Sequence, residues 1–267
     1  MKILFMTGSH PRHLFIARKL YDSGRLAGLV VERRGHFLPS PPPGILEIDR
    51  NNFIRHFQDR EQAEFKAFGS IDLSYFDSQL PILQVTPAEL NLEATKRWLQ
   101  KNKCDIAVSY GIHKLQNDLL NVLPDRAWNI HGGLSPWYRG TVTLFWPFYF
   151  LKPNWAGMTI HQLSSKIDAG DIIHHAVPVL KRGDGVHDVA CRAVQQVAMD
   201  LLQIIDKLES GESVEGIPQK TNGKLFLNAE WTPQHLRLLY NMFDNDIVDR
   251  YLDGEFGSSE PPLVRAF

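Results

Sequence analysis

The sequence contains little of what marks a secreted, membrane or metal-binding protein. Its 267 residues include two cysteines, Cys104 and Cys191, which lie far apart and lack the spacing of zinc ligands. We interpret both as small buried hydrophobic residues, as expected in a reducing compartment. No apolar run approaches the roughly 20 residues of a membrane-spanning helix, and the chain does not start with the pattern of a signal peptide. We therefore expect a cytoplasmic protein without a membrane partner.

A marked excess of charge is also absent. The formal net charge is −1, from 29 basic and 30 acidic residues. A protein with this balance exerts no overall electrostatic attraction on nucleic acid, and we predict no nucleic-acid partner. The contents of hydrophobic residues (43%) and charged residues (22%) are those of an ordinary folded protein, so the function has to be sought in local motifs.

Strand-like and helix-like patterns alternate along the first 200 or so residues. A buried strand is predicted from Lys2 to Met6, a helix from Leu14 to Tyr21, and a second buried strand from Leu26 to Val31. This order predicts parallel strands joined by a right-handed crossover. Later helices are predicted over 51–68, 92–103 and 118–123, and strands over 105–111 and 127–131. We predict an α/β fold with a doubly wound, mostly parallel sheet.

The pattern changes after Gly211. Asn222-Gly223 lies between short apolar runs within residues 217–227, which indicates a hairpin. Thr232 and Pro233 then suit the start of a helix, as N-cap and first helical residue. We predict a catalytic domain over residues 1–210 and a small C-terminal hairpin and helix extension over 211–267.

Three polar residues near the middle of the chain form the most informative group. Asn129 and His131 are two positions apart on a predicted strand, so their side chains point to the same face. Asp168 follows in a turn-rich segment. When an amine attacks a formyl carbon, an amide and an imidazole can stabilise the oxyanion that forms. A carboxylate can hold the imidazole in one tautomer or accept a proton through a water. The group predicts an acyl-transfer site that needs no metal.

Several further motifs accompany this group in a fixed order. They are Asn129-Ile130-His131, a turn with Pro136 and Arg139-Gly140, then Thr159-Ile160-His161, and Asp168-Ala169-Gly170. Together they resemble the formyltransferases that use N10-formyltetrahydrofolate, over roughly residues 84–180. The resemblance implies a Rossmann-like formyltransferase fold, N10-formyltetrahydrofolate as co-substrate, and Asn129, His131 and Asp168 as the catalytic trio.

The resemblance also implies a folate pocket formed largely by backbone groups. Its residues here would be Leu83, Val85, Tyr110, Gly111, Ile112, Gly133 and Ser135. Many relatives have Ser-Leu-Leu-Pro after the histidine. This chain has Gly133-Leu134-Ser135-Pro136 instead, which changes the local turn.

Other histidines near the motifs are assigned lesser roles. Thr159 and His161 share a strand face beside the trio, and we predict a supporting role for His161 ahead of a chemical one. His174 and His175 look like a metal pair. Neighbouring residues on a strand point to opposite faces, so we reject a shared metal ion.

Candidate acceptor contacts lie in two segments. His10 and Arg12, near His13, could meet a diphosphate or a folate tail, or simply form a polar helix start. Trp137 and Tyr138, in a turn, suit stacking on a substrate ring. Arg139 could bind a phosphate or cap a carbonyl. We predict that most other aromatic residues of this region are core residues, because a predicted helix over 141–151 is apolar nearly all round.

The branches of the family differ in the amine that receives the formyl group. Enzymes acting on glycinamide ribonucleotide have a glycine-rich phosphate loop after the first strand, whereas this chain has Gly8-Ser9-His10-Pro11 there. Enzymes acting on initiator tRNA have a basic C-terminal barrel, whereas here only about 60 residues follow the alternating pattern and their charge is not basic. The remaining likeness is to sugar N-formyltransferases.

We therefore predict formyl transfer to the primary amine of a nucleotide-linked amino sugar. The expected partners are these two small-molecule substrates and a second copy of the chain, in a homodimer formed through the C-terminal extension. The alternatives are formyl transfer to another amine (methionyl-tRNA or glycinamide ribonucleotide), hydrolysis of formyltetrahydrofolate, and a non-catalytic ligand-binding module.

Overall fold

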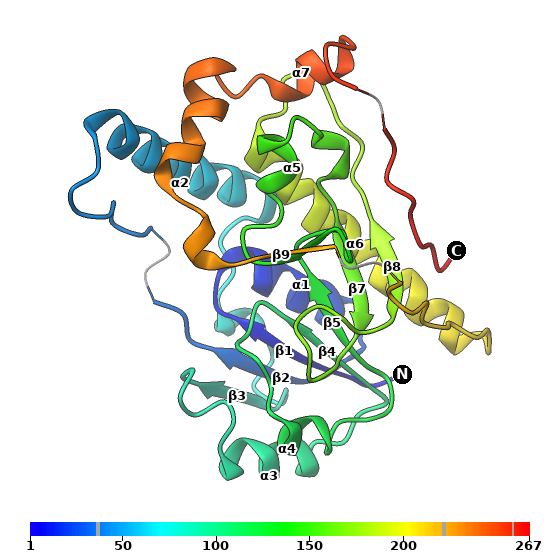
Figure 1. The fold of residues 1–267 in the computed structure, drawn as a ribbon. Coiled ribbons are helices and arrows are strands. Elements are labelled where there is room, and N and C mark those ends of the chain that lie inside the picture. Colours follow the sequence, from blue (N-terminus) through cyan, green and yellow to red (C-terminus); the bar gives the residue numbers. More distant parts are fainter. Residues whose placement is uncertain (36–37, 221–222, 258) are drawn as a thin grey trace.

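A central β-sheet organises the molecule (Figure 1). The computed structural model describes residues 1–35, 38–220, 223–257 and 259–267, and within them seven strands form this sheet in the order β3-β2-β1-β4-β5-β7-β8. The strands are β1 (Ile3–Gly8), β2 (Leu26–Glu32), β3 (Ile82–Val85), β4 (Ile106–Tyr110), β5 (Ala127–His131), β7 (Met158–Gln162) and β8 (Ile172–Ala176). β1 to β5 pair in parallel, whereas β7 is antiparallel to both β5 and β8. The predicted mostly parallel sheet is confirmed.

Helices cover both faces of this sheet. The α-helices are α1 (Pro11–Asp22), α2 (Glu47–Phe68), α3 (Glu93–Lys101), α4 (Asn117–Leu120), α5 (Trp146–Tyr149), α6 (Val186–Glu209) and α7 (Ile247–Leu252). Short helical turns are η1 (Leu73–Tyr75), η2 (Pro153–Trp155), η3 (Asn228–Glu230), η4 (Pro233–His235) and η5 (Leu238–Met242). Ile3 and Phe5 of β1 pack in the cluster that contains α1 and α6, and Leu4 and Met6 in the cluster under α3 and α4. Alternate strand residues thus serve opposite faces, as a doubly wound fold requires.

The predicted helices are present, with two notable differences. The predicted helix over 51–68 starts four residues earlier, as α2, and along it Phe53 is buried whereas Phe65 is 68% exposed. The helix predicted over 141–151 is reduced to α5, whose second residue is Pro147. Proline lacks a backbone N–H and fits only the first turn of a helix, so the helix cannot start much earlier.

The C-terminal part joins the sheet region at two places. β9 (Lys224–Phe226) pairs in parallel with β6 (Tyr138–Gly140), and Ile217 bridges Ile172 of β8. The predicted turn residue Asn222 lies outside the described residues, and the described segments on either side of it pair with other strands. η4 follows Thr232 with Pro233 first, as predicted. The domain division at residue 210 stays a prediction, although α6 ends at Glu209.

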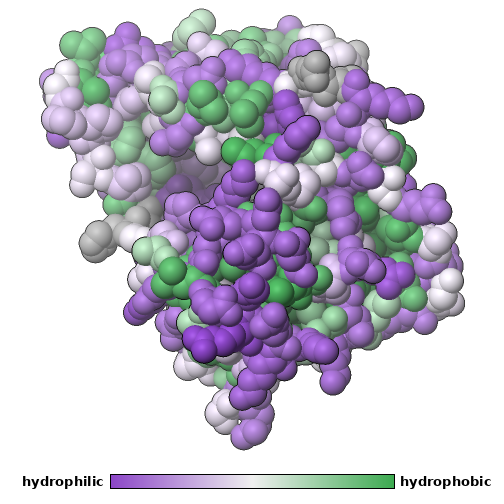
Figure 2. All heavy atoms as spheres, turned by 60° about the horizontal axis from the view of Figure 1, so that its bottom comes forward, coloured by the Kyte–Doolittle hydropathy of each residue, from purple (hydrophilic) through white to green (hydrophobic). Residues whose placement is uncertain are grey.

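Hydrophilic side chains predominate on the face shown in Figure 2, with apolar ones in small groups. Throughout the described ranges, no helix combines the length and the apolar character needed to cross a membrane.

The C-terminal tail covers the exposed edge of β8. The backbone N–H of His175 donates to the Val264 carbonyl (2.8 Å), and those of Val264 and Ala266 donate to Nδ1 of His175 (2.9 Å) and His174 (3.1 Å). The ring of Phe267 stacks on His174. An uncovered edge strand has unpaired backbone groups that can associate with other chains.

Deleting residues 264–267 should therefore destabilise the protein and promote self-association. The deletion removes these three hydrogen bonds and two more, from Arg265 to the His175 carbonyl (2.6 Å) and from Lys207 to the Ala266 carbonyl (2.9 Å). Their loss predicts a fall of roughly 5–10 °C in melting temperature, measured by thermal denaturation, with light scattering to follow association. The substitution Phe267→Ala, which keeps the backbone bonds, is the matched control and should show a smaller loss. An unchanged melting temperature in the truncated chain would contradict this role of the tail.

Candidate active site

A cavity of about 850 Å³ opens at the carboxyl ends of β4 and β5. Strand order reverses between β1 and β4, and ligands of doubly wound folds usually bind at such a point. His13 of α1 lies against this point. A Cβ atom on Gly111 would lie 2.3 Å from its ring, and Gly111 has a φ of +63°. Glycine at position 111 thus permits both the turn after β4 and the imidazole beside it.

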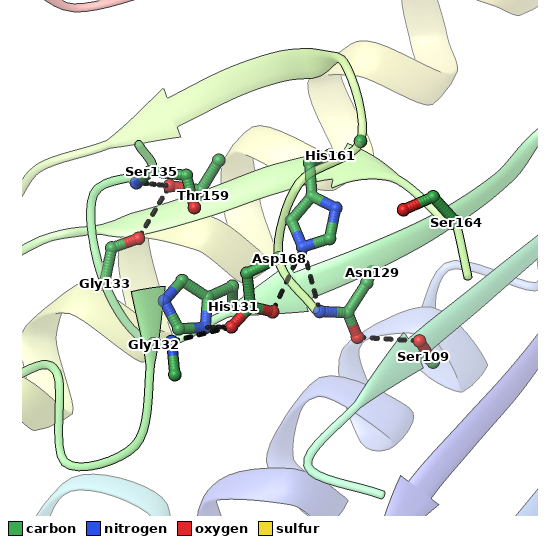
Figure 3. Close-up of polar contacts among 12 residues, drawn as sticks. Ser109, Asn129, His131, Gly132, Gly133, Ser135, Thr159, His161, Ser164 and Asp168 are labelled. Carbon is green, nitrogen blue, oxygen red and sulfur yellow. Dashed lines mark hydrogen bonds and ion pairs between the residues drawn. The ribbon is translucent and has the colours of Figure 1, made fainter. Parts of the chain in front are cut away.

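The three residues of the predicted trio converge on one wall of this cavity (Figure 3). Asn129 and His131 come from β5 and share a face, while Asp168 comes from the loop between β7 and β8. Nδ1 of His131 lies 3.3 Å from Oδ2 of Asp168. Nε2 of His161, on β7, lies 3.5 Å from Oδ1 of Asp168 and 3.1 Å from Nδ2 of Asn129. His161 therefore lies between the amide and the carboxylate.

The backbone sets the proton position on His131. Its Nε2 donates to the carbonyl oxygen of Tyr138 at 2.7 Å. This leaves Nδ1 as the unprotonated nitrogen of the neutral ring, facing Asp168. Burial lowers the pKa of His131 below its ordinary value, against the opposing effect of the Asp168 charge. Tyr138 thus fixes the tautomer, which is one of the two roles considered for Asp168, and Asp168 is placed to stabilise an imidazolium.

Asp168 is held as an ionised carboxylate in an uncommon backbone conformation. Its φ of +46° is in the left-handed region, which Asp and Asn tolerate better than most residues. Oδ2 accepts the backbone N–H of Gly140 at 2.8 Å. Burial would raise the pKa of Asp168, but the charges that His131 and His161 can carry and the Gly140 N–H together lower it to about 2.

The loop after His131 is held by Thr159, for which the sequence motifs indicate no specific role. Oγ1 of Thr159 donates to the Gly133 carbonyl (2.6 Å) and accepts the Ser135 N–H (2.9 Å). Nε2 of His175 donates to the Ser135 carbonyl at 2.8 Å. A Cβ atom on Gly133 would lie 2.5 Å from the Tyr138 carbonyl oxygen. Glycine there permits the close approach of that carbonyl to His131.

The predicted metal-like pair splits between two faces. His175 contacts the loop described above, whereas Nε2 of His174 donates to Asp200 at 3.0 Å on α6. In the part of the chain that the structure describes, no group of three His, Cys, Asp or Glu side chains is placed to hold a metal ion.

The other predicted site residues divide into two groups. Tyr110, Gly111, Ile112 and Arg12 line the cavity. Eight do not: Leu83, Val85, Gly133, Ser135, His10, Trp137, Tyr138 and Arg139.

The residues outside the cavity have other contacts. Leu83 and Val85 pack in the cluster under α3, because β3 is at the far edge of the sheet. Trp137 packs on Trp155 with ring centroids 5.4 Å apart. The Tyr138 ring stacks on Phe226 at 5.8 Å.

The predicted polar site residues that do not line the cavity also have partners elsewhere. Arg139 donates to the Gly223 carbonyl at 3.0 Å, which is the carbonyl-capping alternative considered for it. The His10 ring stacks on His13, and Ser135 is fully buried in the loop described above.

The side of the cavity formed by α1, α2 and α6 has polar residues that the sequence patterns did not single out. Arg60, His56 and His187 line it together with Arg12, which pairs with Glu64. Burial lowers the pKa of His56 to about 3 and that of His187 well below the ordinary value. Burial and the nearby Arg12 charge lower the pKa of Arg60 to about 10, so it stays positive at neutral pH. This wall offers positive charge and neutral imidazoles.

The fold, the cavity and its polar groups are those of a doubly wound enzyme that can carry out acyl transfer. Comparison with known proteins identifies the family. The formyl transferase family model matches residues 56–204, more than half of the chain. The chain belongs to the formyl transferase family, as its motifs predicted, and formyl transfer is the reaction of this family.

Solved structures with a similar fold include several formyltransferases. The formyltransferase PseJ from Anoxybacillus kamchatkensis, in complex with UDP-4,6-dideoxy-4-formamido-L-AltNAc and tetrahydrofolate, is 17% identical, with a TM-score of 0.52 over 92% of this chain and 95% of that one. An N-formyltransferase from Helicobacter canadensis, in complex with folinic acid and dTDP-3-aminofucose, is 13% identical, with a TM-score of 0.52 over 87% and 73%. Glycinamide ribonucleotide transformylase 1 from Symbiobacterium toebii is 19% identical, with a TM-score of 0.55 over 81% and 91%. At these identities the similarity establishes the fold.

Proposed function

We propose that this protein transfers the formyl group of N10-formyltetrahydrofolate to the primary amine of a nucleotide-linked amino sugar. The observation that carries the proposal is the convergence of Asn129, His131 and Asp168 on one wall of the cavity, with the imidazole and carboxylate 3.3 Å apart. Similar folds bind folates together with UDP- or dTDP-linked sugars, which supports the choice of both substrates.

The folate binds against the end of β4. Tyr110, Gly111 and Ile112 line the cavity there, and the β7–β8 loop, which contains Asp168, also lines it. This placement puts the formyl carbon beside the trio. It uses the three predicted folate residues that reach the cavity and leaves out Leu83, Val85, Gly133 and Ser135, which do not.

Each residue of the trio has its own role in the reaction. The neutral amine attacks the formyl carbon, forming a C–N bond and placing negative charge on the formyl oxygen. An N–H of Asn129 stabilises that oxygen. The proton lost by the amine passes to Nδ1 of His131, where Asp168 stabilises the imidazolium. The proton on Nδ1 of His131 then goes to N10 of tetrahydrofolate as the C–N10 bond breaks and the formyl oxygen regains its double bond.

The acceptor binds against the side of the cavity formed by α1, α2 and α6. A nucleotide-linked sugar has a negatively charged diphosphate, and Arg12 and Arg60 are the positive side chains that line this side of the cavity. His56 and His187 stay neutral at physiological pH because burial lowers their pKa. They therefore contribute hydrogen bonding without further charge.

The test is a panel of amines with N10-formyltetrahydrofolate, followed by tetrahydrofolate formation and by the mass of the acceptor. We expect one formyl group to be added to at least one UDP- or dTDP-linked 3-amino or 4-amino sugar. Formylation of glycinamide ribonucleotide or methionyl-tRNA alone would overturn the acceptor assignment. Formate release without any amine, at the rate seen with it, would show a hydrolase instead.

The homodimer expected from the sequence remains a prediction. Light scattering coupled to size-exclusion chromatography measures it directly. A mass of one chain at micromolar concentration would contradict it.

A further inference from the structure

Ser109 has no part in the reaction described above, yet its hydroxyl touches the catalytic amide. It lies on β4 opposite Asn129 in the parallel register, and its side chain is 1% exposed. Oγ lies 2.7 Å from Oδ1 of Asn129 (Figure 3). An amide oxygen can only accept, so the hydroxyl donates to it. The alternative acceptor within reach, the Trp128 carbonyl oxygen, lies 3.5 Å away, a long and weak contact.

The other side of the amide is fixed by His161. Nδ1 of His161 donates to the Gln162 carbonyl at 2.9 Å, which leaves Nε2 as an acceptor in the neutral ring. Nε2 therefore accepts an N–H from Nδ2 of Asn129 at 3.1 Å. Ser109 and His161 thus specify the same orientation of the amide from opposite sides. Of the two hydrogens on Nδ2, one is used by His161 and the other is available to a ligand in the cavity.

We propose that Ser109 is a positioning residue for formyl transfer, acting through Asn129. By donating to Oδ1, it keeps the amide oxygen turned towards β4 and the free N–H turned into the cavity, where the formyl oxygen gains charge. The inference rests on the proposed catalytic role of Asn129. It adds a residue that none of the motifs in the sequence contains.

Loss of the hydroxyl changes the balance between the two orientations of the amide. Without Ser109, Oδ1 faces a buried strand with no donor, which is unfavourable for a polar atom. A rotation of the amide by half a turn would let Oδ1 meet water in the cavity. It would then present a carbonyl oxygen to the developing oxyanion, and the two would repel each other.

The experiment is a double-mutant cycle between Ser109→Ala and Asn129→Ala. Ser109→Ala should lower kcat by about 10- to 100-fold, less than the loss from removing an oxyanion donor outright, and leave KM for both substrates within about threefold. In the Asn129→Ala background the second substitution should have almost no further effect. Ser109→Thr, which keeps the hydroxyl and suits a strand, should restore most of the rate.

The control is Ser23→Ala at the end of α1. Its hydroxyl also makes one 2.7 Å hydrogen bond, to the Leu20 carbonyl, far from the cavity. Its kcat should equal that of the unchanged protein. A Ser109→Ala rate within twofold of the unchanged protein, or independent, multiplying effects of the two substitutions in the cycle, would overturn the role of Ser109.

A readout without turnover separates this inference from the proposed function. The side-chain amide signal of Asn129 in a 15N-correlated NMR spectrum, assigned by its loss in Asn129→Ala, should shift in Ser109→Ala and return in Ser109→Thr. An unshifted signal would refute the contact whatever the activity. Full activity of Asn129→Ala would instead refute the catalytic role on which the inference rests.

Discussion

Replacing Asp168 by Asn should lower kcat for formyl transfer by roughly a thousandfold or more. The carboxylate stabilises the imidazolium that His131 becomes when it takes up the amine proton, and an amide has no charge with which to do so. The amide oxygen can still accept the Gly140 N–H that Oδ2 accepts at 2.8 Å. Asn also tolerates the φ of +46° found at this position. The loss should therefore appear in the chemistry and leave the fold unchanged.

The measurement is kcat with a formyl acceptor, together with folate affinity by calorimetry and the melting temperature. Asp171→Asn is the matched control, because Asp171 lies three residues further along the same segment with an exposed side chain. We expect it to keep near-full rate. A near-normal kcat in the Asp168→Asn variant would refute the proposed chemistry.

Replacing Thr159 by Val should destabilise the protein by about 2–4 kcal/mol, because two backbone partners are left without hydrogen bonds in a buried place. The side chain is fully buried, and its hydroxyl joins the Gly133 carbonyl to the Ser135 N–H. Valine has nearly the same shape, so the change isolates these two bonds. The loop also leads to the Tyr138 carbonyl that orients His131, and we therefore expect kcat to fall as well.

Denaturant unfolding measures the first effect and steady-state kinetics the second. Thr95→Val on α3 is the comparison, since its buried hydroxyl makes one hydrogen bond, to the Glu89 carbonyl at 3.0 Å, remote from the cavity. It should lose less stability and no activity. Equal losses of stability in the two variants, with activity intact in both, would show that the loop does not depend on Thr159.

Strands β1, β2, β4 and β5 were predictable because they are short apolar runs that need burial on both faces. Asn129, His131 and Asp168 were predictable because strand periodicity puts the first two on one face and the motif order supplies the third. The pairing of β6 with β9 was not predictable. Each strand has three residues, and they meet across more than 80 positions of sequence. Short strands have too few side chains to reveal a pattern.

Contacts between segments far apart in the sequence were not predictable either, because no local pattern indicates which side chains meet. Trp137 in a turn suggested stacking on a substrate, but Trp155 of η2 lies beside it. His56 and His187 belong to helices whose patterns gave no sign that α2 and α6 meet at the cavity wall. In the sequence, Ser109 is one polar residue in an apolar strand. Its role becomes visible only from the strand register, which places it opposite Asn129.

The support of His131 extends beyond the central sheet. The carbonyl that holds its Nε2 belongs to β6, and β6 pairs with β9, which comes from the segment after α6. Tyr138 stacks on Phe226, and Arg139 holds the Gly223 carbonyl, so this strand pair is fixed by side chains as well. Chimeric enzymes that exchange their carboxy-terminal segments to alter acceptor choice would thus also disturb the basicity of the imidazole, and selectivity and rate could not be engineered separately by that route.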